Sequence, residues 1–397
     1  MIIKLCREFA RVIINICEFY SIFLREIIYN IRIHTFNKKK IYQEGITILK
    51  PRRIFAVLFV LLICTVSSAD EVYDSKPSYY APYYSGAVKS SVLNDALDEL
   101  NYIRNLIGVP DNVTLNAEYT NKAQHAAVLL DLIDKLTHTP SKPYDLNKKF
   151  YDLAYEGTTH SNLSERKLYV NNIPSGSITL SSSLKLFMHD SDSANIRSLG
   201  HRRWLMNPRL RQTGFGISTR RGYAAVYVIE EFSKSRTLPP NEYKKYLKWL
   251  KWPIKDEFIT WPARKKSHPL TYFENDSAWS VTLNKDIFES CKENAINITL
   301  TRRSDNKSWH FNSSRRDGYF TVNKENIAYD ECIIFRPDNI SSYKDGETWD
   351  VNITGLRRKN GTPGKISYSV RFTNSMTGYE EDDNIFTELK GIRRRNK

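Results

Sequence analysis

Three stretches in the first half of the chain repeat apolar residues every three or four positions, which is the spacing of an amphipathic helix. We predict helices over residues 91–107, 117–136 and 180–189. The first is followed by Gly108 and Pro110, residues that commonly stand just after the end of a helix. The stretches 213–218 and 223–232 are instead rich in glycine, β-branched and aromatic residues and predict paired strands. Helices followed by strands predict an α+β domain, which we assign to residues 90–235.

The second half of the chain alternates apolar and polar residues with a period of two. This alternation recurs at 296–300, 349–353 and 366–372, separated by Asn, Asp and Gly turns. Short alternating runs of this kind predict an all-β immunoglobulin-like sandwich, which we assign to residues 266–379.

The remaining segments of the chain are assigned to connections and termini. They are a basic extension (1–53), an apolar run with its flanks (54–69), a Tyr-, Ser- and Pro-bearing linker (70–89), a second linker (236–265) and a charged tail (380–397).

The uncharged apolar run at 54–66 is too short to span a membrane comfortably. Basic residues precede it and Ser67, Ser68 and Ala69 follow it, which is the pattern of a signal peptide cleaved after Ala69. Cleavage predicts a secreted, extracellular protein. The alternative is an uncleaved type II signal anchor that displays the later domains outside the cell, with membrane contact only through residues 1–69.

Two further patterns agree with an extracellular destination. Beyond Ala69 the only cysteines are Cys291 and Cys332, an even pair that we expect to form a disulfide bond in an oxidising compartment. All nine N-glycosylation sequons follow the apolar run, so we expect a glycoprotein. The sequon asparagines are Asn112, Asn162, Asn275, Asn297, Asn306, Asn312, Asn339, Asn352 and Asn360.

The formal net charge of +15 arises from 59 basic and 44 acidic residues. Apart from the two termini, the basic residues are spread along the chain and form no nucleic-acid-binding motif, so no nucleic-acid partner is expected. A positive charge of this size favours anionic partners such as membrane surfaces or acidic glycans.

Candidate chemistry lies in the α+β domain, where His138, Asp190 and His201 fall near predicted helix ends and loops. Two imidazoles and a carboxylate can hold a divalent ion with one position open, or can act as acid and base. The spacing of these residues matches no local metal-binding motif.

Five short strings in this domain resemble the CAP superfamily, which includes cysteine-rich secretory proteins, antigen 5 proteins and plant pathogenesis-related proteins. The most specific is Gly-His-Arg-Arg-Trp-Leu-Met-Asn-Pro at 200–208. The others are Thr-His-Thr-Pro at 137–140, Ser-Asn-Leu at 161–163, Phe-Met-His-Asp at 187–190 and Thr-Gly-Phe-Gly at 213–216. The chain is most similar to the cysteine-poor, bacterial-type branch, and the resemblance to this SCP-like domain covers residues 90–233.

The resemblance implies an α-β-α sandwich with a cleft lined by two histidines and two acids. His138 and His201 match the two histidines, and Asp190 stands in place of the usual glutamate of the third-helix motif. Ser161 stands where the family has the glutamate of a Gly-Glu-Asn motif, so one carboxylate is missing.

Neighbouring residues are expected to support this cleft. They are His160, Asn162, Arg202 and Trp204. The arginines Arg202 and Arg203 are expected to bind backbone carbonyls or acids, and Trp204 to fill the core. For His125 and His189 we expect only packing or surface roles.

These features predict a binding protein without catalysis, whose cleft takes a small apolar ligand such as a sterol or lipid, a glycan, or a divalent ion. No cofactor is required, although His138 and His201 would suit a divalent metal such as zinc. One alternative is a metal-assisted hydrolase that uses His138, Asp190 and His201. Another is an adhesion protein whose sandwich binds a cell-surface glycan or protein.

Overall fold

The computed structural model describes residues 72–166, 168–170, 173–175, 178–230, 239–325, 327–328 and 330–376, without the side chains of 168–170, 173–175 and 240. Contacts divide the chain into two units, Met1–Ser68 and Ala69–Lys397, and every described residue belongs to the second. The predictions for residues 1–53, 54–69 and 380–397 therefore lie outside the described residues. Within the described part, no helix has the length and apolar character needed to cross a membrane.

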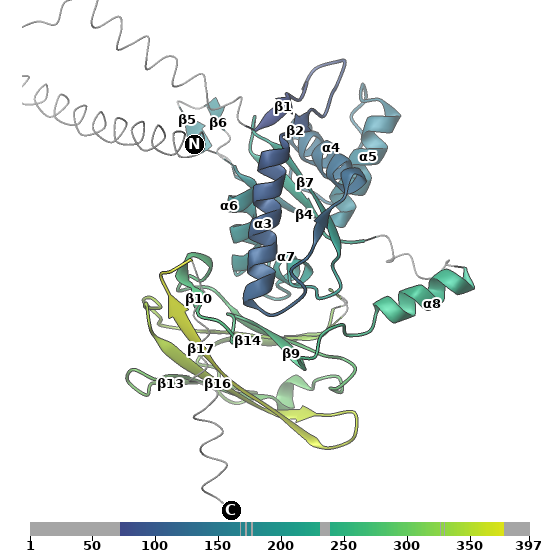
Figure 1. Ribbon diagram of the computed structural model, residues 1–397. Helices are drawn as coiled ribbons and strands as arrows, with labels where there is room; N and C mark the ends of the chain where they lie inside the picture. Colours follow the sequence, from purple (N-terminus) through teal and green to yellow (C-terminus); the bar gives the residue numbers. More distant parts are fainter. Residues whose placement is uncertain are drawn as a thin grey trace, which may run out of the picture. The chain divides into compact units, whose positions relative to one another are not determined.

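The amino-terminal half of the described chain holds five α-helices (Figure 1). They are α3 (Ser90–Leu106), α4 (Ala117–Ile133), α5 (Lys148–His160), α6 (Leu180–His189) and α7 (Gly200–Leu205). The bounds of α3, α4 and α6 agree with the three predicted helices, so these predictions are confirmed. The sequence pattern did not predict α5, because its glycine and threonines are weak helix formers.

A four-stranded sheet lies between these helices, in the order β3-β7-β8-β4. Its strands are β3 (Thr114–Leu115), β4 (Ser161–Glu165), β7 (Gln212–Ser218) and β8 (Tyr223–Tyr227). On β8, Tyr223, Ala225 and Tyr227 pack against buried residues of α4. The alternate residues Ala224 and Val226 join the core formed with α3 and α6. Helices therefore cover both faces of this sheet, and the described chain is α+β.

The segment at 70–89 is more than the linker that we expected. It contains β1 (Tyr73–Ser75) and β2 (Ala87–Val88), which pair in an antiparallel ribbon. The Tyr73 hydroxyl donates a hydrogen bond to the carbonyl oxygen of Ile217 on β7, at 3.1 Å. This bond ties the ribbon to the sheet. A further short hairpin joins β5 (Leu168–Val170) to β6 (Ile173–Ser175).

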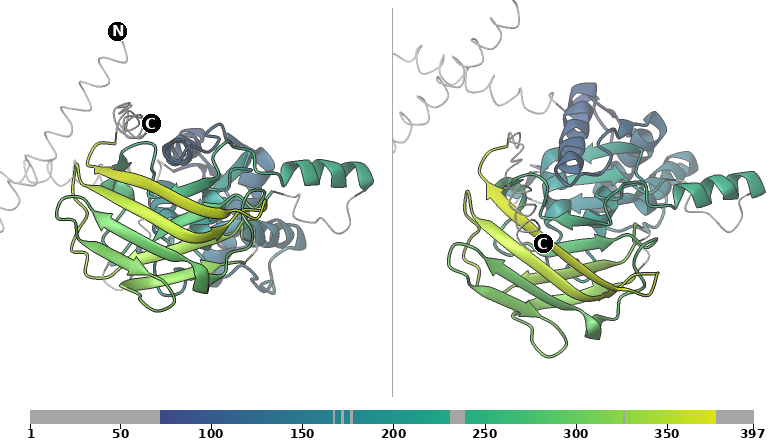
Figure 2. Two further views of the ribbon diagram at one scale, coloured as in Figure 1. Left: turned by 90° about the horizontal axis from the view of Figure 1, so that it is seen from below. Right: turned by 60° about the horizontal axis from the view of Figure 1, so that its bottom comes forward.

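Two sheets form the carboxy-terminal half and face each other around a shared core (Figure 2). One has the order β10-β17-β16-β12-β13 and the other β14-β15-β11-β9. The strands are β9 (Phe258–Trp261), β10 (His268–Pro269), β11 (Trp279–Leu283), β12 (Asn297–Arg302), β13 (Ser308–Phe311), β14 (Gly318–Asn323), β15 (Cys332–Pro337), β16 (Thr348–Arg357) and β17 (Pro363–Thr373). Two short 3-10 helices, η3 (Leu270–Tyr272) and η4 (Glu293–Ala295), lie between strands. Trp279 and Trp349 meet in the core with ring centroids 6.2 Å apart.

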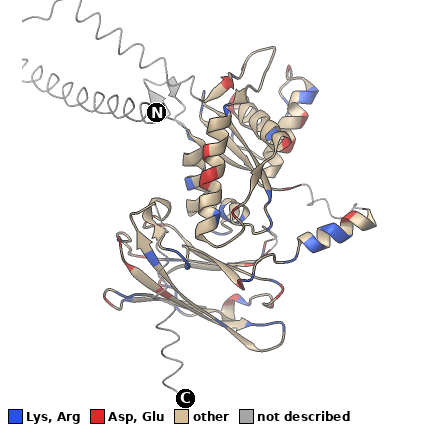
Figure 3. Ribbon diagram, in the orientation of Figure 1, with Lys and Arg blue, Asp and Glu red and all other residues tan. Residues whose placement is uncertain are grey.

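The boundary that we expected between linker and sandwich, at residue 266, lies too far along the chain. Strand β9 pairs with β11, so the sandwich already includes residues before 266. The expected linker also contains α8 (Pro240–Trp249), which carries Lys244, Lys245 and Lys248. Basic residues on this helix are coloured blue in Figure 3. Pro240 begins this helix, where a residue without an N–H group leaves no hydrogen bond unmade.

Buried arginines join the helical part to the sandwich, which agrees with the structural roles expected for Arg202 and Arg203. The Arg202 guanidinium donates to the carbonyl oxygens of Met188 at 2.6 Å and Ala278 at 2.7 Å. Arg203 Nη1 donates to Asn323 Oδ1 at 2.6 Å. Arg202 thus bonds to groups on both sides of the boundary, and Arg203 bonds across it to Asn323 of the sandwich.

The disulfide bond expected between Cys291 and Cys332 is absent, because both residues are buried free thiols. Cys332 begins the central strand β15, where its Sγ accepts a hydrogen bond from Thr282 Oγ1 at 3.7 Å. Burial raises the pKa of Cys291 to about 12 and also raises the pKa of Cys332, so both stay protonated.

One of the nine sequon asparagines cannot carry a glycan in the folded chain. Asn162 is 2% exposed, and its side chain is held by a hydrogen bond within the protein. The expectation for Asn162 is therefore wrong, because the tripeptide pattern does not report burial. The other eight asparagines are exposed or partly exposed.

Candidate functional site

Asp190 and His201 form a hydrogen-bonded pair at the turn between α6 and α7. Asp190 follows the last residue of α6 in the left-handed conformation, with φ 44°. One of its carboxylate oxygens contacts His201 Nδ1 at 2.8 Å, and the other accepts from the Arg202 backbone N–H at 3.2 Å. The Asp190 side chain is 1% exposed and that of His201 is 23% exposed. A buried carboxylate thus orients a partly exposed imidazole, leaving Nε2 as the nitrogen for proton transfer or metal binding.

The first residues of β4 lie beside this pair. Asn162 Nδ2 donates to the carbonyl oxygen of His201 at 2.9 Å, which joins the Ser-Asn-Leu string to the Gly-His-Arg-Arg-Trp string. The Ser161 hydroxyl is buried, and among the described residues it has no hydrogen-bond partner.

His138 is held by α5. Its Nδ1 donates to the carbonyl oxygen of Thr158 at 2.8 Å, and the Thr158 hydroxyl donates to the carbonyl oxygen of His138 at 3.1 Å. Within the described residues, His138, Asp190 and His201 do not form a metal-binding group, because their ligand atoms do not all lie within 4.8 Å of one another. The structure therefore brings Asp190 and His201 into contact but does not draw His138 into one compact ligand set with them.

The remaining supporting residues have packing roles. The His160 ring stacks on Tyr227 with centroids 5.5 Å apart, and its Nδ1 donates to the carbonyl oxygen of Glu156 at 2.9 Å. Trp204 is partly buried and packs against the main core. His125 is tilted against Phe150 with ring centroids 4.6 Å apart, which agrees with the packing role expected for it.

A groove with a cavity volume of about 490 Å³ lies between α6, the end of β4 and the loop that follows η3. Its lining includes Ser182 and Lys185 on α6 and Thr271 and Tyr272 on the sandwich side. Ile178 and Leu186, the latter 50% exposed, add apolar surface. Sequence analysis did not identify this groove, because its two walls come from segments almost ninety positions apart in the chain.

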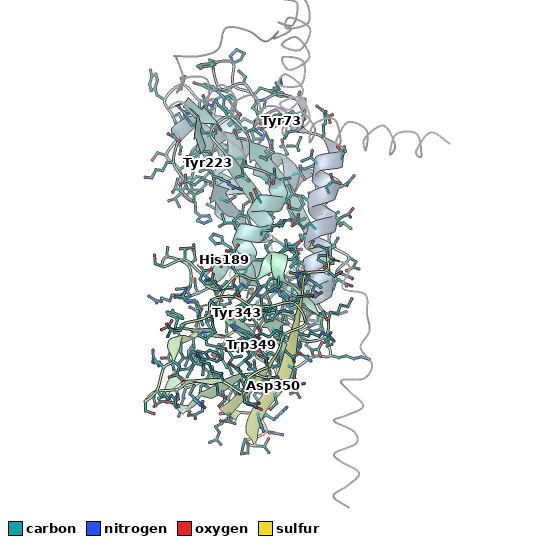
Figure 4. All side chains as sticks on the ribbon, turned by 90° about the vertical axis from the view of Figure 1, so that its left-hand side faces the viewer. Tyr73, His189, Tyr223, Tyr343, Trp349 and Asp350 are labelled. Carbon is teal, nitrogen blue, oxygen red and sulfur yellow. The ribbon has the colours of Figure 1, made fainter. Side chains whose placement is uncertain are left out.

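His189 is the residue whose role differs most from the expectation. It lines the groove at the end of α6, and its Nε2 contacts Asp276 Oδ1 at 2.9 Å (Figure 4). Partial burial raises the pKa of Asp276, but the hydrogen bond and the charge of His189 lower it, and the net pKa lies below its usual range. The histidine therefore stands beside an ionised carboxylate on the opposite wall.

Across the groove, the aromatic ring of Tyr272 is fixed in place. Its hydroxyl donates to Glu99 Oε1 at 3.0 Å, and Lys185 Nζ lies 5.8 Å from its ring centroid. Burial and the neighbouring Glu99 carboxylate raise the pKa of Tyr272, so the phenol stays protonated. The groove thus presents hydroxyls, apolar side chains and charges of both signs, and the buried Tyr272 ring supports its wall.

No protein-family model matches the chain, and searches of curated proteins and of solved structures also find no significant match.

Proposed function

We propose that this chain is an extracellular binding protein that takes a hydroxyl-rich ligand, of the glycan class, in the groove between α6 and the loop after η3. Its helical part would be a CAP-type α-β-α sandwich, and its carboxy-terminal part an immunoglobulin-like sandwich. The observation that carries the proposal is the lining of the groove, which joins hydrogen-bonding groups to the exposed apolar side chain of Leu186.

Support for the CAP assignment comes from the contacts among the family-like strings. Asp190 of the Phe-Met-His-Asp string binds His201 of the Gly-His-Arg-Arg-Trp string, and Asn162 of the Ser-Asn-Leu string binds the same residue's carbonyl. Segments 39 positions apart in sequence thus converge on one histidine. The order of layers, with helices on both faces of a four-stranded sheet, is the architecture that the resemblance implies.

Support for an extracellular location comes from the sequons. Eight of the nine asparagines lie at exposed or partly exposed positions, where a glycan can be attached without unfolding the chain. The apolar run at 54–66 with its basic and small-residue flanks has the pattern of a secretion signal.

The choice of a glycan over a sterol follows from the groove's chemistry. Hydroxyls of Ser182 and Thr271 and the ammonium of Lys185 can hydrogen-bond to sugar hydroxyls, and a sugar's C–H face can pack on the exposed side chain of Leu186. A sterol has one hydroxyl and would leave most of these polar groups desolvated without partners, which is costly.

Catalysis is not part of the proposal. The Asp190–His201 pair has the form of an oriented general base, and this observation favours a hydrolase as the second candidate. A hydrolase with a serine nucleophile needs its hydroxyl hydrogen-bonded to the base, and within the described residues the neighbouring Ser161 hydroxyl has no hydrogen-bond partner.

The test uses the purified full chain on a glycan array, followed by calorimetric titration of the best-binding oligosaccharide. We expect the double variant Lys185→Ala/Thr271→Ala to weaken binding at least tenfold, because it removes hydrogen-bonding groups from both walls. The matched control is Lys148→Ala, since Lys148 is exposed on α5 away from the groove and should leave the dissociation constant unchanged.

Binding of labelled cholesterol with no oligosaccharide bound would overturn the proposal in favour of an apolar ligand. Turnover of the bound oligosaccharide that is lost in His201→Ala would overturn it in favour of the hydrolase. If Lys185→Ala/Thr271→Ala binds as tightly as the unaltered chain, the ligand does not occupy this groove.

A further inference from the structure

We propose that His189, Glu274 and Asp276 form a binding site for a divalent transition-metal ion at the edge of the groove. The site lies outside the Asp190–His201 pair and includes none of the residues that resemble the CAP tetrad.

The three side chains converge in space from two separate elements. Each offers one ligand atom, an imidazole nitrogen or a carboxylate oxygen, and these three atoms all lie within 4.8 Å of one another. His189 Nε2 and Asp276 Oδ1 are 2.9 Å apart. In the tetrahedral geometry of Zn²⁺, two ligands each about 2.1 Å from the metal are about 3.4 Å apart, so the hydrogen-bonded pair needs to separate by only about 0.5 Å to hold an ion.

The backbone on the α6 side of the site is held firmly. His189 is the last residue of α6, and its carbonyl oxygen accepts hydrogen bonds from Arg202 Nη2 at 2.5 Å and from the Ser191 hydroxyl. Arg202 is fully buried, so the end of the helix is anchored through the core. An imidazole carried on such an anchored turn loses little further freedom when it binds a metal.

The loop on the other side is also closed by its own hydrogen bonds. The Glu274 backbone N–H donates to Ser277 Oγ at 2.9 Å, and the Ser277 N–H donates back to the Glu274 carbonyl oxygen at 3.0 Å. Ser277 is fully buried, and Arg336 Nη1 donates to the Asp276 carbonyl oxygen at 3.4 Å. The two carboxylates therefore project from a fixed turn toward the helix end.

Charge and access both suit a cation. Because carboxylates and imidazoles bind metals in their deprotonated forms, two carboxylates and one imidazole would contribute a charge of −2, which balances a divalent ion. The Glu274 and Asp276 side chains are exposed, while the His189 side chain is 23% exposed, so an ion reaches the site from solvent. Within the described residues, Lys185 lies over the Tyr272 ring and Arg336 donates to the Asp276 carbonyl oxygen, so neither forms an ion pair with the two carboxylates, although the charge of Arg336 lowers the pKa of Asp276.

The ligand set indicates which metals the site would take. One imidazole nitrogen and two carboxylate oxygens suit Zn²⁺ or Mn²⁺, whereas Ca²⁺ and Mg²⁺ prefer oxygen ligands alone. Three protein ligands leave coordination positions open, and all three residues line the groove. A bound ion would therefore face the cavity and could accept a hydroxyl oxygen of a ligand.

The experiment measures binding of the metal alone, so it does not depend on the ligand proposed for the groove. The full chain is produced in a host without N-glycosylation, because Asn275 lies between two of the ligands and is itself a sequon asparagine. Zn²⁺ and Mn²⁺ are titrated into the purified, chelator-treated chain by calorimetry, with Ca²⁺ as the comparison. Elemental analysis after dialysis gives the stoichiometry.

We expect the full chain to bind one equivalent of Zn²⁺ or Mn²⁺ and to bind Ca²⁺ at least tenfold more weakly. Glu274→Gln/Asp276→Asn should weaken the transition-metal binding at least tenfold, since amides keep the shape but lose the charge. The matched control Glu325→Gln/Asp305→Asn changes two exposed acids elsewhere and should bind as the unaltered chain does. His138→Ala/His201→Ala should also retain the equivalent, because those residues belong to the other site.

Thermal unfolding without metal checks that every variant is folded. An unaltered chain that holds no metal after dialysis and shows no titration signal would overturn the proposal. The proposal would also be overturned if one equivalent of metal remains bound in Glu274→Gln/Asp276→Asn or is lost in His138→Ala/His201→Ala. Either result would place the ion elsewhere.

Discussion

The His268 imidazole is fully buried beside Trp261, whose ring centroid lies 4.3 Å away. Its Nδ1 accepts a hydrogen bond from the Ala263 backbone N–H at 3.1 Å, so the neutral ring carries its proton on Nε2. Within the described chain Nε2 has no hydrogen-bond partner. Burial, and secondarily the charge of Arg202, lower the pKa of His268 from 6.5 to about 3.

This lowered pKa predicts an acid-sensitive fold. Below about pH 6.5 the unfolded chain takes up a proton at His268 that the folded chain does not. The free energy of unfolding therefore decreases as the pH is lowered. For this one group the loss is about 1.4 kcal/mol per pH unit until about pH 3. We expect His268→Phe, which cannot titrate, to reduce the dependence of the free energy of unfolding on pH between 6 and 4, measured by urea denaturation. An identical pH dependence in the variant would show that His268 does not contribute.

At the scale of elements, two glycines of β7 determine how α4 lies on the sheet. A Cβ atom at Gly214 would lie 2.2 Å from the Thr120 backbone nitrogen, and one at Gly216 would lie 2.2 Å from the Ala123 carbonyl group. Neither glycine has a positive φ, so the reason for glycine is space and not backbone conformation. The Thr-Gly-Phe-Gly string therefore lets a helix backbone rest directly on a strand.

We expect Gly216→Ala to lower the free energy of unfolding by about 3 kcal/mol, because the added methyl group forces α4 away from β7. Gly200→Ala is the matched control. Its Cβ would meet nothing closer than 3.7 Å, so its effect should stay within about 0.5 kcal/mol. Urea denaturation measures both. If the two variants are equally stable, α4 can move away from β7 without a loss of stability.

At the scale of the whole described unit, the helical part and the sandwich share one hydrophobic core and buried polar contacts. The Arg209 guanidinium contacts the Asp330 carboxylate at 2.5 Å, with both side chains 1% exposed. Arg203 reaches the carbonyl of the same aspartate. The sandwich is therefore part of the same folding unit as the helical part. It is not a separate domain that a linker would join to the helical part as a spacer.

We expect Asp330→Asn to destabilise the chain by about 3–5 kcal/mol, because it leaves the buried Arg209 without a counter-charge. Both halves should unfold together in the variant. Tryptophan fluorescence reports mainly the sandwich, which holds Trp261, Trp279, Trp309 and Trp349, and circular dichroism reports the helices, so their transitions should coincide. The control Asp152→Asn removes an exposed pair with Lys148 and should leave the midpoint unchanged. Two separate transitions would show that the halves fold independently.

Local pattern was sufficient to predict α3, α4, α6 and several strands of the sandwich, because helical and strand periodicities are properties of neighbouring residues. The resemblance to a family went further and placed Asp190 and His201 in one site, where the structure has them in contact. Neither source could show that Asn162 is buried or that Cys291 and Cys332 are unpaired, since burial and side-chain distance depend on the completed fold.

The groove and its histidine were decided by tertiary structure alone. His189 and Asp276 are 87 positions apart, and each looks like an ordinary surface residue in its own segment. They meet because buried arginines such as Arg202 fasten the end of α6 to the segment that begins β11. The sequence by itself determined α3, α4, α6 and several strands of the sandwich. The packing of the two halves determined which polar side chains face one another. These contacts join residues far apart in the sequence, and a local pattern does not predict them.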